Sequence, residues 1–303
     1  MIKKIILVTA SVLLFLCSCS NSGGKIKELT FAAIPSEDMV QTTKYTENFS
    51  KYLEKELGIK VKYFIATDYT AVIEAMRTNK CQICIFGPFS YILASEKAGA
   101  EALVAIGFKG GGYFSYNSLL LSYPGSGLHN MDDVKRNASR LRLTFTDPAS
   151  TSGHLVPRSY LTSIGLDPDK SFASVAFASN HGASLLSVYS GNTDVGAANT
   201  QSYTRLIARG KVDSSKFIIL WKSPPLLWDP FCVKSTLPAE LKEKIRGAFI
   251  NMPVKDSASF NQYIKYTFEG DKMRDSLIFR EISDSSFNSL RVIARTIKSL
   301  NIK

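Results

Sequence analysis

The chain has 303 residues, of which 45% are hydrophobic and 21% charged. This length and composition favour a folded protein of two domains and exclude a largely disordered chain. The net charge is +11 at pH 7, and the basic residues are scattered along the chain. A scattered positive charge favours a small anionic ligand or a membrane surface as the partner, and disfavours nucleic acid.

Residues 1–18 have the layout of a secretory signal peptide, in which two lysines precede an apolar run from Ile5 to Leu16. The run is too short to span a bilayer comfortably, so we expect an exported protein without a transmembrane body. The sequence before Cys19 resembles the lipobox of bacterial lipoproteins. We therefore predict that Cys19 is lipidated and that residues 19–27 form a tether. Cleavage nearby, giving a soluble secreted protein, is the alternative.

The segment after the tether alternates strand-like and helix-like patterns. The predicted strands and helices cover, in order, 28–35, 48–58, 60–67, 68–79 and 81–87. Asp68 stands where a helix N-cap is expected, and Gly58 supplies a helix stop. This order predicts a largely parallel sheet with helices on both faces.

A second unit with the same alternation follows. Its predicted elements cover 118–124, 131–139, 141–148, a helix led by residues 150–153, then 171–178, 181–192 and 193–199. Residues 217–233 are predicted to return to the first unit, and the remainder is mainly helical, with helices over 240–252 and 285–300. The sequence predicts an α/β protein of two lobes: residues 28–115 plus 224–303 form the first, and 116–223 the second.

Cys81 and Cys84 form a CxxC pair that could indicate a redox or zinc site. The surrounding sequence is typical of a strand, on which residues three apart point to opposite faces. No second CxxC or histidine pair completes a metal site. We therefore predict that both cysteines are core residues, and that the protein binds no metal.

The segment DPASTSGHLVP places three hydroxyl side chains, Ser150, Thr151 and Ser152, where a strand ends and a helix begins. The first amides of a helix have no internal partner and carry the positive end of its dipole. Together with the hydroxyls they could hold a tetrahedral oxyanion without a lysine. A simple helix cap is the alternative, although a cap needs only one hydroxyl.

Several motifs in order resemble one family, the phosphonate, phosphite and phosphate binding proteins of bacterial ABC importers. The resemblance runs from about Leu29 to Pro253, and the segments that carry it are DYTAVIEAMR, FGPFSYILA, GGYFSYNSLLL, DPASTSGHLVPRSYL, NHGASLLSVYSGNTDVGAANT and WKSPPLLWDPF. It implies a type II periplasmic-binding-protein fold. Each lobe is expected to have a mixed, mostly parallel sheet flanked by helices, and the ligand cleft lies between the lobes.

The resemblance also implies roles for single residues. Ser150, Thr151 and Ser152 match a triplet that clamps the phosphonate group at the helix N-terminus. Tyr69 and Tyr113 match tyrosines that contact the bound oxyanion from the first lobe. His181 matches a histidine that hydrogen-bonds it from the second lobe. On the sequence alone the two tyrosines could equally be core aromatics, and the histidine could be a local cap.

Two positions concern the organic end of the ligand. In relatives that bind aminoalkylphosphonates the amine meets carboxylates, and Asp229 matches one of them. Gln201 occupies the other position, and an amide supplies no charge to an ammonium group. The sequence therefore leaves phosphite, methylphosphonate and phosphate as competing ligands.

The resemblance implies a component of an importer, with an ABC permease as its membrane partner, no cofactor and no catalysis. We also expect the protein to be a monomer. A serine hydrolase is disfavoured because no GxSxG motif is present, and His154 is poorly placed to act as a base for Ser152. Two alternatives stay open from the sequence. One is a sensor that reports ligand to a membrane kinase, and the other is a surface lipoprotein with a macromolecular partner.

Overall fold

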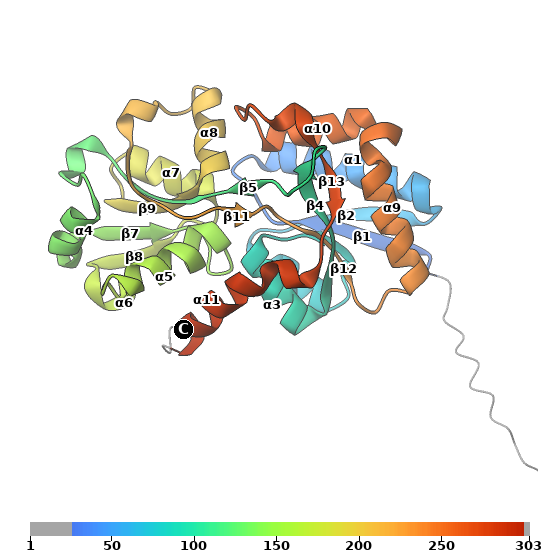
Figure 1. Ribbon diagram of the computed structural model, residues 1–303, viewed down its shortest axis with the longest axis horizontal. Coiled ribbons are helices and arrows are strands. Elements are labelled where there is room, and N and C mark those ends of the chain that lie inside the picture. Colours follow the sequence, from blue (N-terminus) through green and yellow to red (C-terminus); the bar gives the residue numbers. More distant parts are fainter. Residues whose placement is uncertain (1–25, 300–303) are drawn as a thin grey trace, which may run out of the picture.

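The computed structural model describes residues 26–299 and contains two main sheets. The predicted signal peptide and Cys19 lie outside the described residues. We call the part built on the six-stranded sheet the first lobe and the part built on the five-stranded sheet the second lobe. Figure 1 shows the two lobes side by side along the long axis.

The sheet of the first lobe has the order β13-β4-β12-β3-β1-β2. Its strands are β1 (Glu28–Ala33), β2 (Lys60–Ile65), β3 (Ile83–Ile85), β4 (Ala100–Phe108), β12 (Phe231–Lys234) and β13 (Leu277–Glu281). The strands β1, β2 and β3 pair in parallel, and β12 is antiparallel to both β3 and β4. Four of the six strands therefore run in the same direction, and β12 and β13 run against them.

The sheet of the second lobe has the order β10-β6-β9-β7-β8. Its strands are β6 (Ser118–Ser122), β7 (Arg142–Phe145), β8 (Ser174–Phe177), β9 (Val195–Asn199) and β10 (Ile218–Lys222). Only β6 runs against the others, because it is antiparallel to both β9 and β10. The antiparallel pair of β5 (Ser115–Tyr116) and β11 (Leu226–Leu227) forms a separate ribbon between the lobes.

Helices cover both faces of each sheet. In the first lobe they are α1 (Met39–Leu57), α2 (Tyr69–Arg77), α3 (Pro88–Ala98), α9 (Ala239–Lys255), α10 (Ser257–Thr267) and α11 (Asn288–Ser299). In the second lobe they are α4 (Met131–Asn137), α5 (Val156–Ser163), α6 (Pro168–Ser171), α7 (His181–Tyr189) and α8 (Thr200–Ala208). A π-helical turn, Thr151–Leu155, leads directly into α5. Short 3-10 turns lie at Pro124–Ser126, Ala138–Arg140, Ser214–Lys216, Arg274–Ser276 and Asp284–Phe287.

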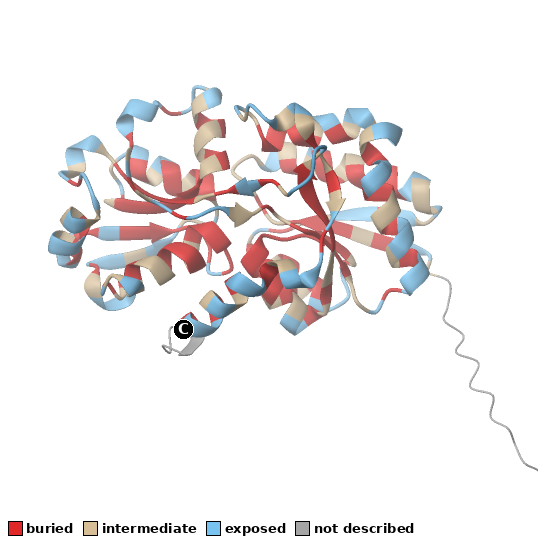
Figure 2. Ribbon diagram, viewed as in Figure 1, coloured by how far each residue is buried: buried red, intermediate tan, exposed pale blue. Residues whose placement is uncertain are grey.

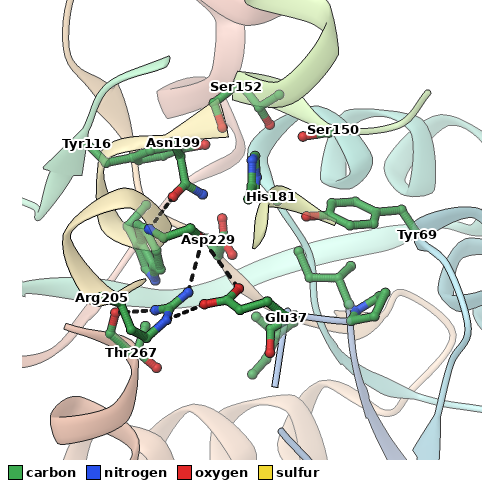
Figure 3. Close-up of a pocket in the computed structure, with 18 of the residues that line it drawn as sticks. Glu37, Tyr69, Tyr116, Ser150, Ser152, His181, Asn199, Arg205, Asp229 and Thr267 are labelled. Atoms are coloured by element: carbon green, nitrogen blue, oxygen red, sulfur yellow. Dashed lines mark hydrogen bonds and ion pairs between the residues drawn. The ribbon is translucent and has the colours of Figure 1, made fainter. Parts of the chain in front are cut away.

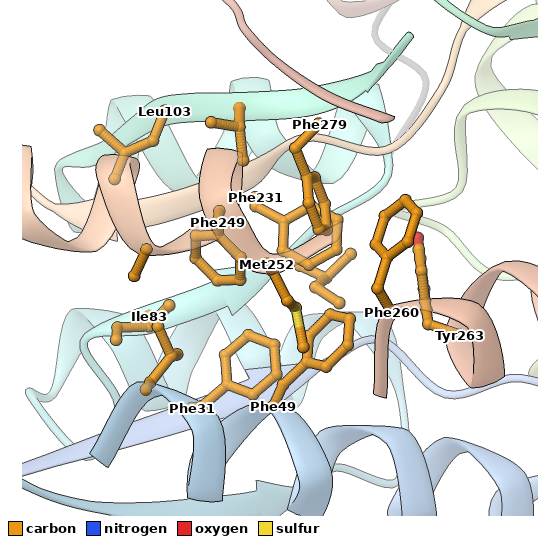
Figure 4. Close-up of a cluster of buried hydrophobic side chains, with 14 of the residues drawn as sticks. Phe31, Phe49, Ile83, Leu103, Phe231, Phe249, Met252, Phe260, Tyr263 and Phe279 are labelled. Carbon is orange, nitrogen blue, oxygen red and sulfur yellow. The ribbon is translucent and has the colours of Figure 1, made fainter. Parts of the chain in front are cut away.

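An aromatic cluster packs α1, α9 and α10 against one face of the first sheet (Figure 4). Phe49 of α1 is fully buried and stacks against Phe31 of β1, with ring centroids 6.1 Å apart. Phe231 of β12 meets Phe249 of α9 edge-on at 5.0 Å. Buried residues form the layers between sheet and helices in both lobes (Figure 2), so each lobe has its own core.

Local signals explain where α1 and α2 begin and end. Asp38 accepts a hydrogen bond from the Gln41 amide at the start of α1, and Gly58 ends that helix with a φ of 64°. This left-handed conformation favours glycine. Asp68 accepts from the Ala71 amide at 2.7 Å, as its predicted capping role requires.

Some elements differ from the sequence-based expectation. The helix predicted for 48–58 is the second half of α1, which begins nine residues earlier at Met39. No helix was predicted for the segments that form α3 and α8, and α10 lies in the segment that was predicted to be mainly helical without bounds of its own. The sequence of α3 does not show the one-sided apolar pattern of an amphipathic helix, because apolar and buried residues occur on most of its surface.

The expectation that the cysteines point to opposite faces is wrong. The strand begins only at Ile83, so Cys81 lies in the preceding turn and its Sγ is 3.1 Å from Cys84 Sγ. Both side chains are completely buried, as the core interpretation requires. Within residues 26–299, no helix is long and apolar enough to cross a membrane.

Candidate functional site

A cavity of about 70 Å³ lies between the lobes (Figure 3). The loop after β1, the loop between β11 and β12, and residues of α10 bound it from the first lobe or its margin. The starts of α7, α8 and the π-helical turn bound it from the second lobe. Such a volume holds only a few water-sized groups. The position, at the carboxyl ends of strands, is where α/β proteins commonly bind ligands.

The predicted hydroxyl triplet lines this cavity. Ser150 Oγ accepts a hydrogen bond from the Gly153 amide at 3.1 Å, and Thr151 Oγ1 accepts from the Phe89 amide at 2.8 Å. A hydroxyl that accepts in this way still has its own proton to donate. Ser150 is therefore both a helix cap and a candidate donor, so the two interpretations of the triplet are compatible.

The helix that follows the triplet opens with a wide turn. The Leu155 amide bonds to the Ser150 carbonyl at 3.0 Å, five residues back. Gly153 is required here, because a Cβ at this position would lie 2.0 Å from Thr146 Oγ1. The amides of Thr151 and Ser152, first in the helix, have no intrahelical acceptor and lie at the positive end of its dipole.

His181 is the first residue of α7 and also lines the cavity. Its Nδ1 lies 3.2 Å from Thr146 Oγ1. Burial lowers the pKa of His181 to about 4, so the ring is neutral at pH 7. The cap of α7 is Asn180, which accepts from the Ala183 amide, so His181 is not the local cap that the sequence left open.

One of the two predicted tyrosines lies in the wall and the other does not. Tyr69 begins α2, lines the cavity and directs its hydroxyl towards the middle of it (Figure 3). Tyr113 lies outside the cavity, where its hydroxyl donates to the Glu281 carbonyl. The structure therefore places Tyr113 outside the cavity wall, whereas Tyr116, three residues later in β5, lines the cavity.

Of the two residues expected at the organic end of the ligand, one lies in the cavity wall and the other does not. Asp229 lines the cavity, and burial raises the pKa of its carboxyl to about 8. Gln201 is buried but does not line the cavity, and its Oε1 accepts from Thr200 Oγ1 at 2.8 Å. The structure thus places Gln201 within α8 and outside the cavity wall, unlike Asp229.

An ion pair closes the cavity opposite the hydroxyl triplet (Figure 3). It was not predicted from the sequence. Arg205 Nε of α8 donates to Glu37 Oε1 of the loop after β1 at 2.5 Å. Arg205 Nη1 donates to the Thr267 carbonyl at 2.8 Å, and Nη2 donates to Ser202 Oγ at 3.0 Å. Glu37 keeps a lowered pKa because the guanidinium outweighs the effect of burial.

Residues 31–271 match the family described as the periplasmic substrate-binding protein of phosphonate ABC transporters. The chain belongs to this family. It is 30% identical over 262 residues to the phosphate-import protein PhnD of Mycolicibacterium smegmatis, covering 81% of each chain. It is 31% identical to the phosphonates-binding periplasmic protein of Escherichia coli, covering 78% of this chain and 69% of that one.

A solved structure agrees with this assignment. The fold is similar to that of a binding-protein component of a phosphonate ABC transporter from Pseudomonas aeruginosa, with a TM-score of 0.77 and 27% identity. The similarity covers 88% of this chain and 85% of that one. The family is one of transport substrate-binding proteins with a type II periplasmic-binding-protein fold, as the resemblance implied. Within residues 26–299, no group of three or more His, Cys, Asp or Glu side chains could hold a metal ion.

Three cavity residues that were not predicted from the sequence, Glu37, Arg205 and Tyr116, have only weak sequence features that indicate a site. Glu37 follows the first strand of a parallel sheet, a position that often faces a ligand cleft. Arg205 is four residues after Gln201 on an amphipathic helix, so both share a face. Tyr113 and Tyr116 stand in the same motif, GGYFSYN, and no local signal decides which of them faces the cavity.

Proposed function

We propose that this family member captures a small phosphorus oxyanion in the cavity between its lobes and delivers it to a membrane permease. The observation that carries the proposal is the hydroxyl triplet at a helix start inside that cavity. Ser150 and Thr151 each accept a hydrogen bond from a backbone amide, and each hydroxyl still carries a proton that it can donate to an anion. Tyr69, Tyr116 and neutral His181 add further polar groups around the same space.

The cavity supports a small ligand such as phosphite, phosphate or methylphosphonate. Its volume is about 70 Å³, and the Glu37–Arg205 pair occupies the side away from the hydroxyls. The relatives are named for phosphate in one case and for phosphonates in the other. The shared chemistry is a tetrahedral phosphorus oxyanion, and the substituent differs among the candidates.

Isothermal titration calorimetry tests this proposal directly. Purified protein in phosphate-free buffer is titrated with phosphite, phosphate, methylphosphonate and 2-aminoethylphosphonate, with sulfate as the control. We expect saturable binding of at least one phosphorus oxyanion. Replacing Ser150, Thr151 and Ser152 together by Ala, Val and Ala should weaken it by several kcal/mol, because each hydrogen bond to a charged group contributes about 1.5 to 3 kcal/mol. Unchanged affinity would refute the site.

We also propose that the protein is a monomer anchored to a membrane through lipidated Cys19. The support for the anchor is the lipobox-like sequence before Cys19. Mass spectrometry of the mature N-terminus gives the test. An acylated cysteine is expected, and a free terminus would contradict the anchor.

We propose no catalytic step at this site. His154, the histidine nearest the triplet in sequence, is occupied on both ring nitrogens. Its Nδ1 lies 2.8 Å from the Pro148 carbonyl oxygen, and its Nε2 accepts from Arg158 Nε at 2.8 Å. A ring held in this way cannot take a proton from a serine. Recovery of each ligand unchanged after incubation with the protein is the expected result.

A further inference from the structure

The cavity wall contains two carboxyl groups but only one group with a permanent positive charge. Among the described residues that line it, Asp229 and Glu37 carry carboxyl groups and Arg205 carries the permanent positive charge. Arg205 and Glu37 pair with each other, and their side chains are only 6% and 10% exposed. Asp229 has no such partner. Asp229 is therefore the carboxyl group in this wall that remains available to a ligand.

The pair joins the two lobes at one end of the cavity. Glu37 comes from the loop after β1 in the first lobe, and Arg205 comes from α8 in the second. Three different acceptors hold the guanidinium: a carboxylate, a carbonyl and a hydroxyl. The Tyr266 ring also lies 5.1 Å from the guanidinium carbon. These contacts fix both the position and the charge of Arg205 in the wall.

We propose that the Arg205–Glu37 pair determines which substituent the bound oxyanion carries. Arg205 neutralises Glu37, and this leaves a single carboxyl group, Asp229, for a cationic substituent. An ammonium group would also lie near the guanidinium, and like charges in a buried site repel. The pair therefore selects small uncharged substituents over an aminoalkyl group. This inference rests on the proposed function, since it concerns the substituent of the same ligand.

The same geometry predicts how the preference could be reversed. Without the guanidinium, Glu37 and Asp229 would both face the cavity as carboxyl groups. Two carboxyl groups provide the charge and the acceptors that a primary ammonium group requires. In the empty cavity Glu37 would become protonated, because burial raises its pKa when no cation opposes the effect. An ammonium ligand would then displace that proton.

The test compares methylphosphonate with 2-aminoethylphosphonate by calorimetry in wild-type protein and in Arg205→Met. We expect the affinity ratio, 2-aminoethylphosphonate over methylphosphonate, to rise by about tenfold or more in the variant, the order of one charged hydrogen bond. The binding enthalpy of the amine should also depend more strongly on the ionisation enthalpy of the buffer in Arg205→Met than in wild-type protein, because Glu37 releases a proton in addition to any released by Asp229. A purely structural role of Arg205 would not produce this increase.

Three further variants complete the design. Arg205→Lys keeps the charge and should keep the wild-type preference. Glu37→Gln leaves the guanidinium unpaired and should shift the ratio in the opposite direction to Arg205→Met. Arg209→Met breaks two neighbouring ion pairs between the lobes. One joins Arg209 to Asp38 at 3.0 Å, and the other joins Arg209 to Glu269. Arg209 does not line the cavity, so this control should leave the ratio unchanged.

The outcomes separate the inference from the proposed function. If wild-type protein binds an oxyanion but Arg205→Met weakens both ligands equally, as Arg209→Met would, the pair only holds the lobes together and the inference is overturned. An unchanged ratio in both Arg205→Met and Glu37→Gln overturns it as well. If wild-type protein binds neither ligand nor the other phosphorus oxyanions, the proposed function fails and the inference fails with it.

Discussion

Ser150 and Ser152 both line the cavity, but they differ in their contribution to the fold. Ser150 Oγ caps the helix by accepting the Gly153 amide, whereas the structure gives Ser152 Oγ no hydrogen bond to the main chain. A capping hydroxyl contributes about 1 kcal/mol to stability. The two serines therefore allow ligand binding and folding to be separated.

We predict that Ser152→Ala weakens oxyanion binding by roughly tenfold to a hundredfold, with little change in the melting temperature without ligand. Ser150→Ala should lower both the affinity and the melting temperature. Calorimetry and thermal unfolding measure the two effects. Equal losses of stability in both variants would show that Ser152 also supports the fold.

Asp229 gives a prediction for the pH dependence of stability without ligand. Burial raises the pKa of its carboxyl from 3.8 to about 8. The neutral form is favoured in the folded state, so the stability that Asp229 contributes is full below about pH 4 and is lost as the pH rises to about 8. Asp229→Asn has no charge to bury. The variant should become progressively more stable relative to wild type between pH 5 and pH 9.

Thermal unfolding across this pH range checks the Asp229 prediction. The expected gain is on the order of a few kcal/mol at the alkaline end, and water in the cavity would reduce it. Phosphate is left out of every buffer so that no ligand contributes. Melting temperatures that run parallel for both proteins would mean that Asp229 is ionised in the folded state at all these pH values.

At the scale of elements, the start of α7 fits closely against the loop after β1. A Cβ on Gly182 would lie 2.2 Å from the Glu37 Cβ, which belongs to the other lobe. The backbone of Gly182 is helical and needs no glycine for its own conformation. The glycine is therefore required by the contact between the lobes.

We predict that Gly182→Ala weakens ligand binding by about tenfold, because overpacking of this kind costs about 1 to 3 kcal/mol. The melting temperature without ligand should change little if the lobes can separate. Gly247→Ala is a matched control, since a Cβ there meets nothing within 4 Å. Unchanged affinity in Gly182→Ala would mean that Glu37 moves aside at little cost.

The elements predicted correctly from the sequence are those with strong local signals. The side chain of Asp68 caps the start of α2, and Gly58 ends α1 because glycine readily adopts the left-handed conformation. The hydroxyl triplet marks a further helix start. Arg205, in contrast, faces the cavity only because α8 packs beside β9 and the first lobe contributes Glu37. Its role depends on a contact between residues 168 positions apart, which no local pattern contains.

At the scale of the whole molecule, the sequence predicted two lobes and a cleft because alternating strands and helices have few stable arrangements. It predicted a helix over 285–300, but not which elements this helix, α11, would contact. Residues 224–303 were expected to form part of the first lobe, yet α11 contacts α5 and the π-helical turn of the second lobe as well as α3 of the first. Figure 1 shows α11 running from beside α3 towards the second lobe.

The contacts of α11 differ along its length. Just before its start, Phe287 of the preceding 3-10 turn packs against Tyr91 of α3, with ring centroids 4.8 Å apart. Near its end, Ala294 and Ile297 share a small apolar cluster with Phe89 of α3 and Leu155 of the π-helical turn. The helix is therefore anchored on the first lobe and reaches the turn that carries the hydroxyl triplet.

We predict that Ile297→Ala weakens oxyanion binding by about tenfold or more, because removing a buried Ile side chain costs about 2 to 5 kcal/mol and part of that contact is made across the lobes. Val292→Ala is the matched control on the same helix, since Val292 is 63% exposed. Calorimetry measures affinity, and X-ray scattering without ligand measures the radius of gyration, which should increase only in Ile297→Ala. A lower melting temperature with unchanged affinity and radius would place the Ile297 contact within the first lobe alone, because a contact that persists when the lobes separate cannot favour their closure.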